Sequence, residues 1–180
     1  AERPLTARLA DDRLPNVERM DVEFEDGGFP EELDLALLIR FYHDFGWQKV
    51  DREAFNALVF EALKPGGVFA MSNLGAGPNG PHYYPSMWAA TADDSFLSTV
   101  DETRADLEAA GFDILVLEGT GGGNSAEVDA TIKKLETQDL PPIGVQTFVG
   151  AHYKELLLNS MRSRRDGRSI VIETLARKPG

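Results

Sequence analysis

Residues 33–44, Leu-Asp-Leu-Ala-Leu-Leu-Ile-Arg-Phe-Tyr-His-Asp, decide the fold of this chain. The first seven residues are nearly continuous in apolar side chains, as in a parallel strand that is covered on both faces. The strand then runs into Arg40, two aromatic residues, His43 and Asp44. Open α/β sheets bind ligands at the carboxyl ends of their strands. The stretch therefore predicts a buried strand that leads into part of a binding site.

A helix and a second buried strand follow at once. Asp51 is a good N-cap residue, and apolar residues recur at helical spacing from there to Leu63. Pro65 cannot continue a helix, and Gly66-Gly67 supplies a tight reversal. The next strand is expected at 68–72. The order strand, helix, strand predicts a parallel pair.

The remaining elements extend this pattern. A short alternating strand is expected at 17–24 after a helix over 4–12. Thr99 and Glu102 form a capping box for a helix that ends at Gly111, and a strand follows at 112–117. Two more helices, one of them over about 150–163, and a strand at 169–174 complete the chain. The predicted fold is α/β, with a mostly parallel sheet, helices on both faces and a last strand that could return antiparallel.

Composition narrows the classes of function. The chain has 30 acidic and 18 basic residues and a formal net charge of −12, which argues against nucleic acid and anionic membranes as partners. It has no cysteine, so disulfides and thiolate chemistry are excluded. No apolar run approaches the ~20 residues that span a bilayer. We therefore expect a cytoplasmic protein, and the sequence leaves homo-oligomerisation open.

The ordered motifs resemble the C-terminal two-thirds of a class I S-adenosylmethionine-dependent methyltransferase. The resemblance rests on the strand with its polar exit, the turn Leu63-Lys64-Pro65-Gly66-Gly67, and the helix that leads to Ala109-Ala110-Gly111-Phe112. It implies a single Rossmann-like domain over 1–180, with a core at 15–117, a helical insertion at 118–165 and a closing strand at 166–180. The implied activity is methyl transfer from S-adenosylmethionine to a small molecule.

The resemblance also assigns cofactor residues. Glu23 and Phe24 stand where the family holds the adenine, and Arg40 and Phe41 where the methionine part would lie. The family's glycine-rich loop after its first strand is not found before Val17, so the fold is expected to be incomplete at its N-terminus. A circular permutation that uses Gly119–Gly123 as this loop is the less favoured reading, because no acid-ended strand follows at the usual spacing.

His43 and Asp44 are the candidate catalytic residues. Methyl transfer requires an aligned acceptor and removal of its proton, and an imidazole oriented by a carboxylate can accept that proton. The alternative is that His43 is only a hydrogen-bonded loop residue.

Residues 73–98 have no clear period and contain the candidate substrate-binding residues, which are Asn73, His82, Tyr83, Tyr84 and Trp88. Long loops of this kind serve as lids, although these aromatic rings could equally pin the loop onto its own core. The histidines lack metal-ligand spacing, so no metal site is expected. Arg162, Arg164, Arg165 and Arg168 could hold an anion, but a solvated turn is favoured.

Two other functions stay open. The first is a non-catalytic α/β interaction or scaffold domain that has lost cofactor binding. The second and weaker one is a nicotinamide-dependent oxidoreductase, although its glycine fingerprint is also absent. The methyltransferase reading requires that the strands at 33–39 and 68–72 be adjacent and run in the same direction.

Overall fold

The computed structural model describes residues 9, 14–20, 28–121, 125–150 and 152–180. The helix predicted over 4–12 and the second half of the strand predicted at 17–24 therefore lie outside the described residues, apart from Leu9. Residues 17–20 form no strand, so that part of the prediction is wrong. An alternating pattern over so few residues does not by itself supply a neighbouring strand, and a strand needs one to pair with.

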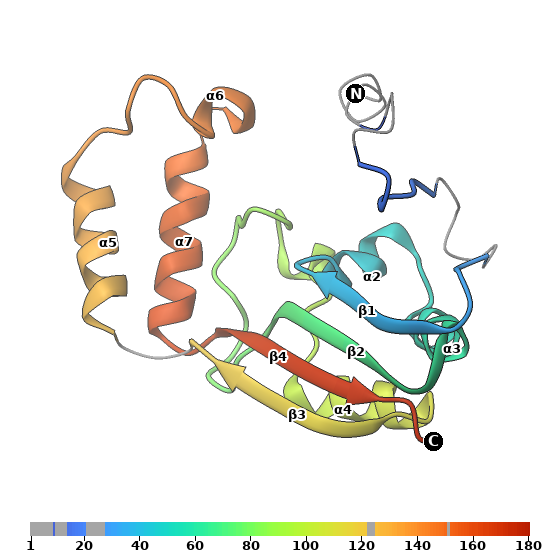
Figure 1. The fold of residues 1–180 in the computed structure, drawn as a ribbon. Coiled ribbons are helices and arrows are strands. Elements are labelled where there is room, and N and C mark those ends of the chain that lie inside the picture. Colours follow the sequence, from blue (N-terminus) through green and yellow to red (C-terminus); the bar gives the residue numbers. More distant parts are fainter. Residues whose placement is uncertain (1–8, 10–13, 21–27, 122–124, 151) are drawn as a thin grey trace.

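The sheet contains four strands in the order β1-β2-β4-β3 (Figure 1). These are β1 (Leu33–Ile39), β2 (Leu63–Ala76), β3 (Asp113–Thr120) and β4 (Ser169–Arg177). β1 and β2 are parallel, with Leu38 opposite Met71 and Ile39 opposite Ser72. β4 is antiparallel to both β2 and β3, so the other three strands share one direction. The predicted mostly parallel, Rossmann-like α/β sheet with a returning last strand is confirmed.

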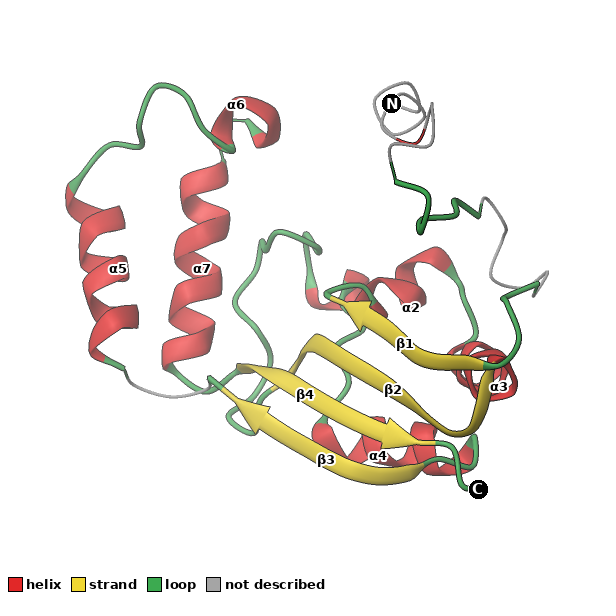
Figure 2. Cartoon of the chain, in the orientation of Figure 1, coloured by secondary structure: helices red, strands yellow, loops and turns green. Residues whose placement is uncertain are grey.

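Two main helices cover one face of the sheet (Figure 2). The first, α3 (Arg52–Ala62), begins at the predicted cap, where the Asp51 carboxylate accepts hydrogen bonds from two backbone amides. The second, α4 (Val100–Ala109), begins at the predicted Thr99–Glu102 capping box. Gly111, with a φ of 97°, then turns the chain into β3, because a glycine tolerates this left-handed conformation.

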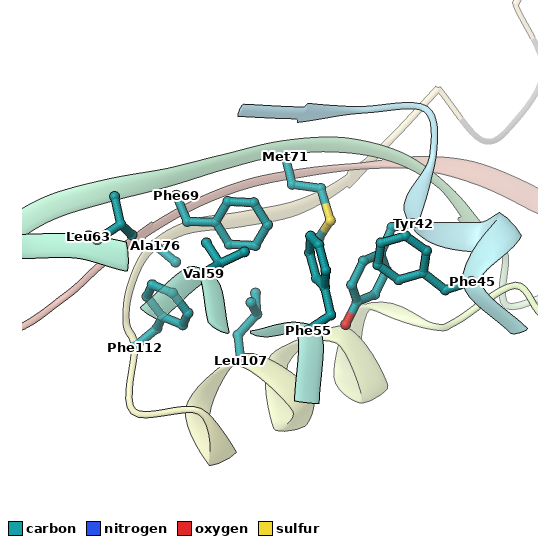
Figure 3. Packing of buried hydrophobic residues seen from close by; sticks show 10 residues of the cluster. All are labelled: Tyr42, Phe45, Phe55, Val59, Leu63, Phe69, Met71, Leu107, Phe112 and Ala176. Atoms are coloured by element: carbon teal, nitrogen blue, oxygen red, sulfur yellow. The ribbon is translucent and has the colours of Figure 1, made fainter. Parts of the chain in front are cut away.

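The core lies between this face and the two helices, and Figure 3 shows ten of its side chains. Phe69 and Met71 project from β2 and are 1% and 2% exposed. They meet Phe55 from α3 and Leu107 from α4 in the same cluster. The alternation of exposure along β2 shows that one face of this strand is dry and the other is not.

The opposite face of the sheet is largely open, and we call it the open face. Residues directly opposite one another across strands share a face, so this face carries Leu35, Leu37 and Ile39 of β1. Their exposed fractions are 53%, 62% and 59%. Within the described residues, no helix packs across its centre, which differs from the expected helices on both faces.

A helical pair stands at the end of the sheet, between β3 and β4 (Figure 1). It consists of α5 (Ala126–Thr137) and α7 (Tyr153–Arg165), with the short α6 (Gln146–Val149) between them. Arg162 of α7 pairs with Glu136 of α5 at 2.8 Å. The pair leads directly into β4, which places α7 beside the carboxyl ends of β1 and β2.

Candidate active site

A cavity of about 350 Å³ lies where β1 and β2 end and β4 begins. It is bounded by the exit of β1, the loop that follows β2, one side of α7 and the first residues of β4. Its lining residues are Arg40, His43, Leu74, His82, Met87, Trp88, Ser160, Met161, Arg164, Ser169, Ile170 and Val171. Ligands of open α/β sheets bind at this edge. The cavity is therefore the candidate active site.

His43 is held in one orientation beside this cavity. It lies in the short helix η3 (Tyr42–Asp44) that follows β1, and its side chain is 10% exposed. The His43 Nδ1 lies 2.9 Å from the Asn73 Oδ1, and the His43 backbone amide donates to the same oxygen at 3.2 Å. The backbone amide can only donate, which identifies the shared atom as the amide oxygen, and because an amide oxygen only accepts, the neutral ring bonds to it through Nδ1–H. The lone pair is then on Nε2.

Asp44 approaches the other side of the ring. One of its oxygens lies 3.5 Å from the His43 Nε2, and its side chain is 33% exposed. At this distance the contact is loose for a neutral imidazole but favourable once the ring is protonated. The predicted pair His43 and Asp44 is thus brought together, with the Asp44 carboxylate on the Nε2 side of the ring.

Asn73 is not in the loop where the sequence placed it. The strand β2 continues to Ala76, and Asn73 points from it toward the covered face with 2% exposure. The prediction of a strand over 68–72 was short at both ends, because 63–67 was read as a helix end and a reversal and Gly75 was read as a loop residue. Asn73 therefore orients His43 and is not among the residues that line the cavity.

The loop after β2 contributes His82 and Trp88 to the cavity wall. The two rings are 4.5 Å apart, and Trp88 also meets the His43 ring edge-on at 5.9 Å. Trp88 thus connects the two histidines. His82 is 5% exposed, and neither of its ring nitrogens has a hydrogen-bond partner among the described residues. Burial lowers the pKa of His82 to about 4, so the ring is neutral at neutral pH.

Two neighbours in this loop are placed differently. The Tyr83 backbone amide donates to the Ser163 Oγ at 2.8 Å, and its hydroxyl donates to Asp166 at 3.0 Å. Tyr83 therefore fastens the loop to the end of α7 and is not among the cavity-lining residues. Tyr84 packs on His82 with 5.6 Å between ring centroids. The loop is thus both pinned to the protein and part of the cavity wall.

The expected cofactor residues separate into two groups. Glu23 and Phe24 lie outside the described residues. Arg40 lines the cavity, and its backbone amide donates to the Ser72 carbonyl at 2.7 Å, which continues the parallel pairing beyond β1. Phe41 packs against the core, with its ring 5.6 Å from that of Phe45. Phe41 therefore supports the fold at the position where the resemblance placed it beside the cofactor.

The wall that α7 supplies was not predicted from the sequence. Ser160, Met161 and Arg164 line the cavity from this helix, and Met87 lines it from the loop. The three residues from α7 have helical spacing, but periodicity alone does not say which element packs against them.

Among the described residues no group of three or more His, Asp or Glu side chains is placed to hold a metal ion. No helix in the described ranges is long and apolar enough to cross a bilayer.

Three solved structures place this fold among known proteins. The [4+2]-cyclase SpnF is 17% identical to this chain, with a TM-score of 0.63. The match covers 98% of this chain and 62% of SpnF. The cyclopropane synthase MmaA2 from Mycobacterium tuberculosis is 17% identical, with a TM-score of 0.62. The match covers 89% of this chain and 63% of MmaA2. Geranyl diphosphate C-methyltransferase from Streptomyces coelicolor A3(2) is 15% identical, with a TM-score of 0.58. The match covers 98% of this chain and 59% of that protein. No protein-family model and no curated protein sequence matches the chain.

These similarities confirm the fold that the motifs predicted, that of class I S-adenosylmethionine-dependent methyltransferases. The similar structures include methyltransferases, one of which was solved with S-adenosylhomocysteine. They also include a protein whose title names a cyclase. The chain spans less than two thirds of each of these three proteins. The similarities therefore show the fold alone.

Proposed function

We propose that this chain forms the acceptor side of an S-adenosylmethionine-dependent methyltransferase that acts on a small molecule. One observation carries the proposal: the Asn73 amide fixes the His43 tautomer at a cavity on the carboxyl edge of two parallel strands. A cavity of this size suits a small molecule, since ligand pockets begin at about 300 Å³.

The described residues fit one end of the cofactor. S-adenosylmethionine supplies, when bound, a methyl group on a positively charged sulfur. Arg40 lines the cavity, and its guanidinium is the proposed partner for the carboxylate at the methionine end. Glu23 and Phe24 remain proposals for the nucleoside end, from the resemblance alone.

The proposed role of His43 is that of general base. Its Nδ1–H donates to Asn73, so Nε2 accepts the proton that the acceptor loses as the methyl group arrives. Asp44 stabilises the protonated ring through the contact at Nε2. Trp88 meets the His43 ring edge-on and supplies apolar surface beside it. His43 and Asp44 thus act on the proton, while Trp88 and His82 form the wall that aligns the acceptor.

Titration calorimetry with S-adenosylhomocysteine tests the cofactor assignment. We expect saturable binding that weakens about tenfold in Arg40→Gln, because a charge-assisted hydrogen bond contributes roughly 1.5–3 kcal/mol. Arg104→Gln is the matched control, since Arg104 pairs with Glu108 on α4, away from the cavity. Absence of binding heat in a folded chain would refute the assignment.

Long-range proton–nitrogen NMR of the imidazoles tests the assignment of the base. The spectrum of the native chain should show His43 protonated on Nδ1 and unprotonated on Nε2 when the ring is neutral. Asn73→Leu removes the acceptor and should mix the two tautomers. If His43 carries its proton on Nε2 in the native chain, it cannot act as the proposed base.

The alternative function, a non-catalytic interaction domain, is favoured by the exposed Leu35, Leu37 and Ile39 on the open face. Exposed apolar patches of this kind mark surfaces that associate with other molecules. It predicts a stable chain that ignores S-adenosylhomocysteine and self-associates or captures a partner through this face. Sedimentation of the chain with and without S-adenosylhomocysteine separates the two readings.

A further inference from the structure

The candidate active site carries positive charge in a strongly acidic protein. One residue in six of the chain is acidic, 30 of 180. None of the residues that line this cavity is acidic, and two of them are Arg40 and Arg164. Other hollows on the surface differ. One is lined by Asp51 and Glu61, and another by Asp101 without a cation. A positively lined cleft raises the local concentration of anions.

Arg164 is held in place by the loop that follows β3. Its Nε donates to the Gly121 carbonyl oxygen at 2.8 Å. A Cβ at position 121 would lie 2.8 Å from the Arg164 Nη2, so glycine leaves the space that the guanidinium occupies. Gly121 also has a φ of 71°, a conformation that favours glycine. The Arg164 side chain is therefore anchored through Nε, while Nη1 and Nη2 have no partner within the described part of the chain.

The other arginines of the same turn are used within the protein. Arg162 pairs with Glu136, and Arg165 pairs with Asp166, each at 2.8 Å. Arg168 donates to the Pro81 carbonyl at 2.9 Å and lies over the Tyr83 ring. Arg164 is thus the member of this basic turn whose terminal nitrogens remain available at the cavity.

The rest of the wall is suited to an apolar body with one polar atom. Trp88, Met87, Met161 and Val171 supply aromatic, thioether and aliphatic surface. His82 lies in this wall, 95% buried, with both ring nitrogens unpaired among the described residues. A buried polar group without a partner is costly, which points to a ligand atom as the partner in the bound state.

We propose that the methyl acceptor is an anion, with an apolar body against Trp88 and a carboxylate or phosphate received by the Nη1 and Nη2 of Arg164. This inference rests on the proposed function, in which Arg40 takes the methionine end of the cofactor. Arg164 belongs to the helical pair between β3 and β4, and Arg40 follows β1. The two cations therefore serve two different anions in one cavity, and His82 hydrogen-bonds a polar atom of the acceptor.

Matched ligands test the charge requirement. The probes are 4-hydroxybenzoate, phenyl phosphate and the neutral 4-hydroxybenzamide, added without cofactor. The chain has two tryptophans, and Trp47 is 68% exposed. Trp47→Phe therefore leaves Trp88 as a fluorescent reporter in the cavity. We expect at least one anion to bind about tenfold more tightly than the amide, as one charge-assisted hydrogen bond supplies. The two anions distinguish a carboxylate from a phosphate.

Variants then assign the preference to Arg164. Arg164→Gln should reduce the preference for the anion to about twofold or less, and Gly121→Ala should reduce it in the same direction by displacing the guanidinium. Arg162→Gln is the control, and it should leave the preference unchanged. Circular dichroism establishes that each variant is folded.

Three results would overturn the proposal. They are equal binding of anion and amide, no binding of any probe at millimolar concentration, and a preference that survives Arg164→Gln. Displacement of the anion by S-adenosylhomocysteine would also overturn it, because the anion would then occupy the methionine end. Since the titrations contain no cofactor, failure of S-adenosylhomocysteine to bind defeats the proposed function and leaves the anion result readable by itself.

Discussion

The two faces of the sheet differ in what covers them, although β1 carries apolar side chains on both. Phe69, on the face beneath α3 and α4, is 1% exposed, whereas Leu37, on the open face, is 62% exposed. A continuous apolar run such as 33–39 indicates burial on both faces. In the structure α3 and α4 cover one face, whereas the open face is uncovered except at one end, where the cavity lies. An apolar pattern thus indicates which side chains of a strand can be buried, but it does not indicate which element packs over them.

The largest effect that tests this comparison is on unfolding free energy. Phe69→Ala should lower it by roughly 3–5 kcal/mol, because the variant loses buried surface and leaves a hole between β2 and the two helices. Leu37→Ala should change it by less than about 1 kcal/mol, since a surface substitution has little to lose. Urea unfolding monitored by circular dichroism measures both. A loss at Leu37 as large as that at Phe69 would mean that the open face is covered in solution.

The next effect concerns the buried end of the open face, where His82 lies. The pKa of His82 is about 4 in the folded chain and near 6.5 when unfolded. Between these values the unfolded chain binds a proton that the folded chain does not, so stability falls as pH falls. The full contribution is up to about 3 kcal/mol.

His82→Phe should remove this part of the pH dependence, because it keeps an aromatic ring against Trp88 and deletes the titrating group. Unfolding by urea at pH 7.5 and at pH 4.5, for the native chain and the variant, gives the difference. Identical pH dependence in the two proteins would show that the His82 ring is hydrated.

The smallest effect compares an enlarged side chain on each face of β2. A Cβ at Gly75 would lie 2.9 Å from the Ser98 carbonyl oxygen and would also clash with the Ile172 side chain. Gly75→Ala should therefore cost about 1–3 kcal/mol through overpacking. Ala70→Val, on the open face of the same strand, should stay within about 0.5 kcal/mol. Thermal unfolding distinguishes the two, and equal losses would contradict the assignment of faces.

Local signals in the sequence predicted much of the fold. Asp51 and the Thr99–Glu102 pair placed two helix starts correctly, because a cap is a contact between neighbours in the chain. The parallel pairing of 33–39 with β2 followed from the helix between them. The end of β2 was missed, because Gly75 lies in a strand where its lack of a side chain admits Ile172. That contact joins residues almost a hundred positions apart.

The candidate site was predicted in part. His43, His82 and Trp88 meet at one cavity, as expected for a strand exit and a following loop. Asn73 proved to be the residue that orients His43, a role that depends on which face of β2 it occupies. Arg164 was passed over among four arginines, because only the packing of α7 beside β4 shows which of them has free nitrogens. Long-range packing decides these assignments, and spacing in the sequence does not encode it.

The direction of β4 has a practical consequence for binding measurements. Its first residue, Ser169, lines the cavity, and Arg177 lies opposite Val68 at the other end of the sheet. Nine residues of extended chain separate the two ends by roughly 27 Å. An affinity tag or a surface linker attached after Gly180 would therefore hold the molecule by the edge remote from the cavity, and immobilised chains would keep their binding edge toward the solution.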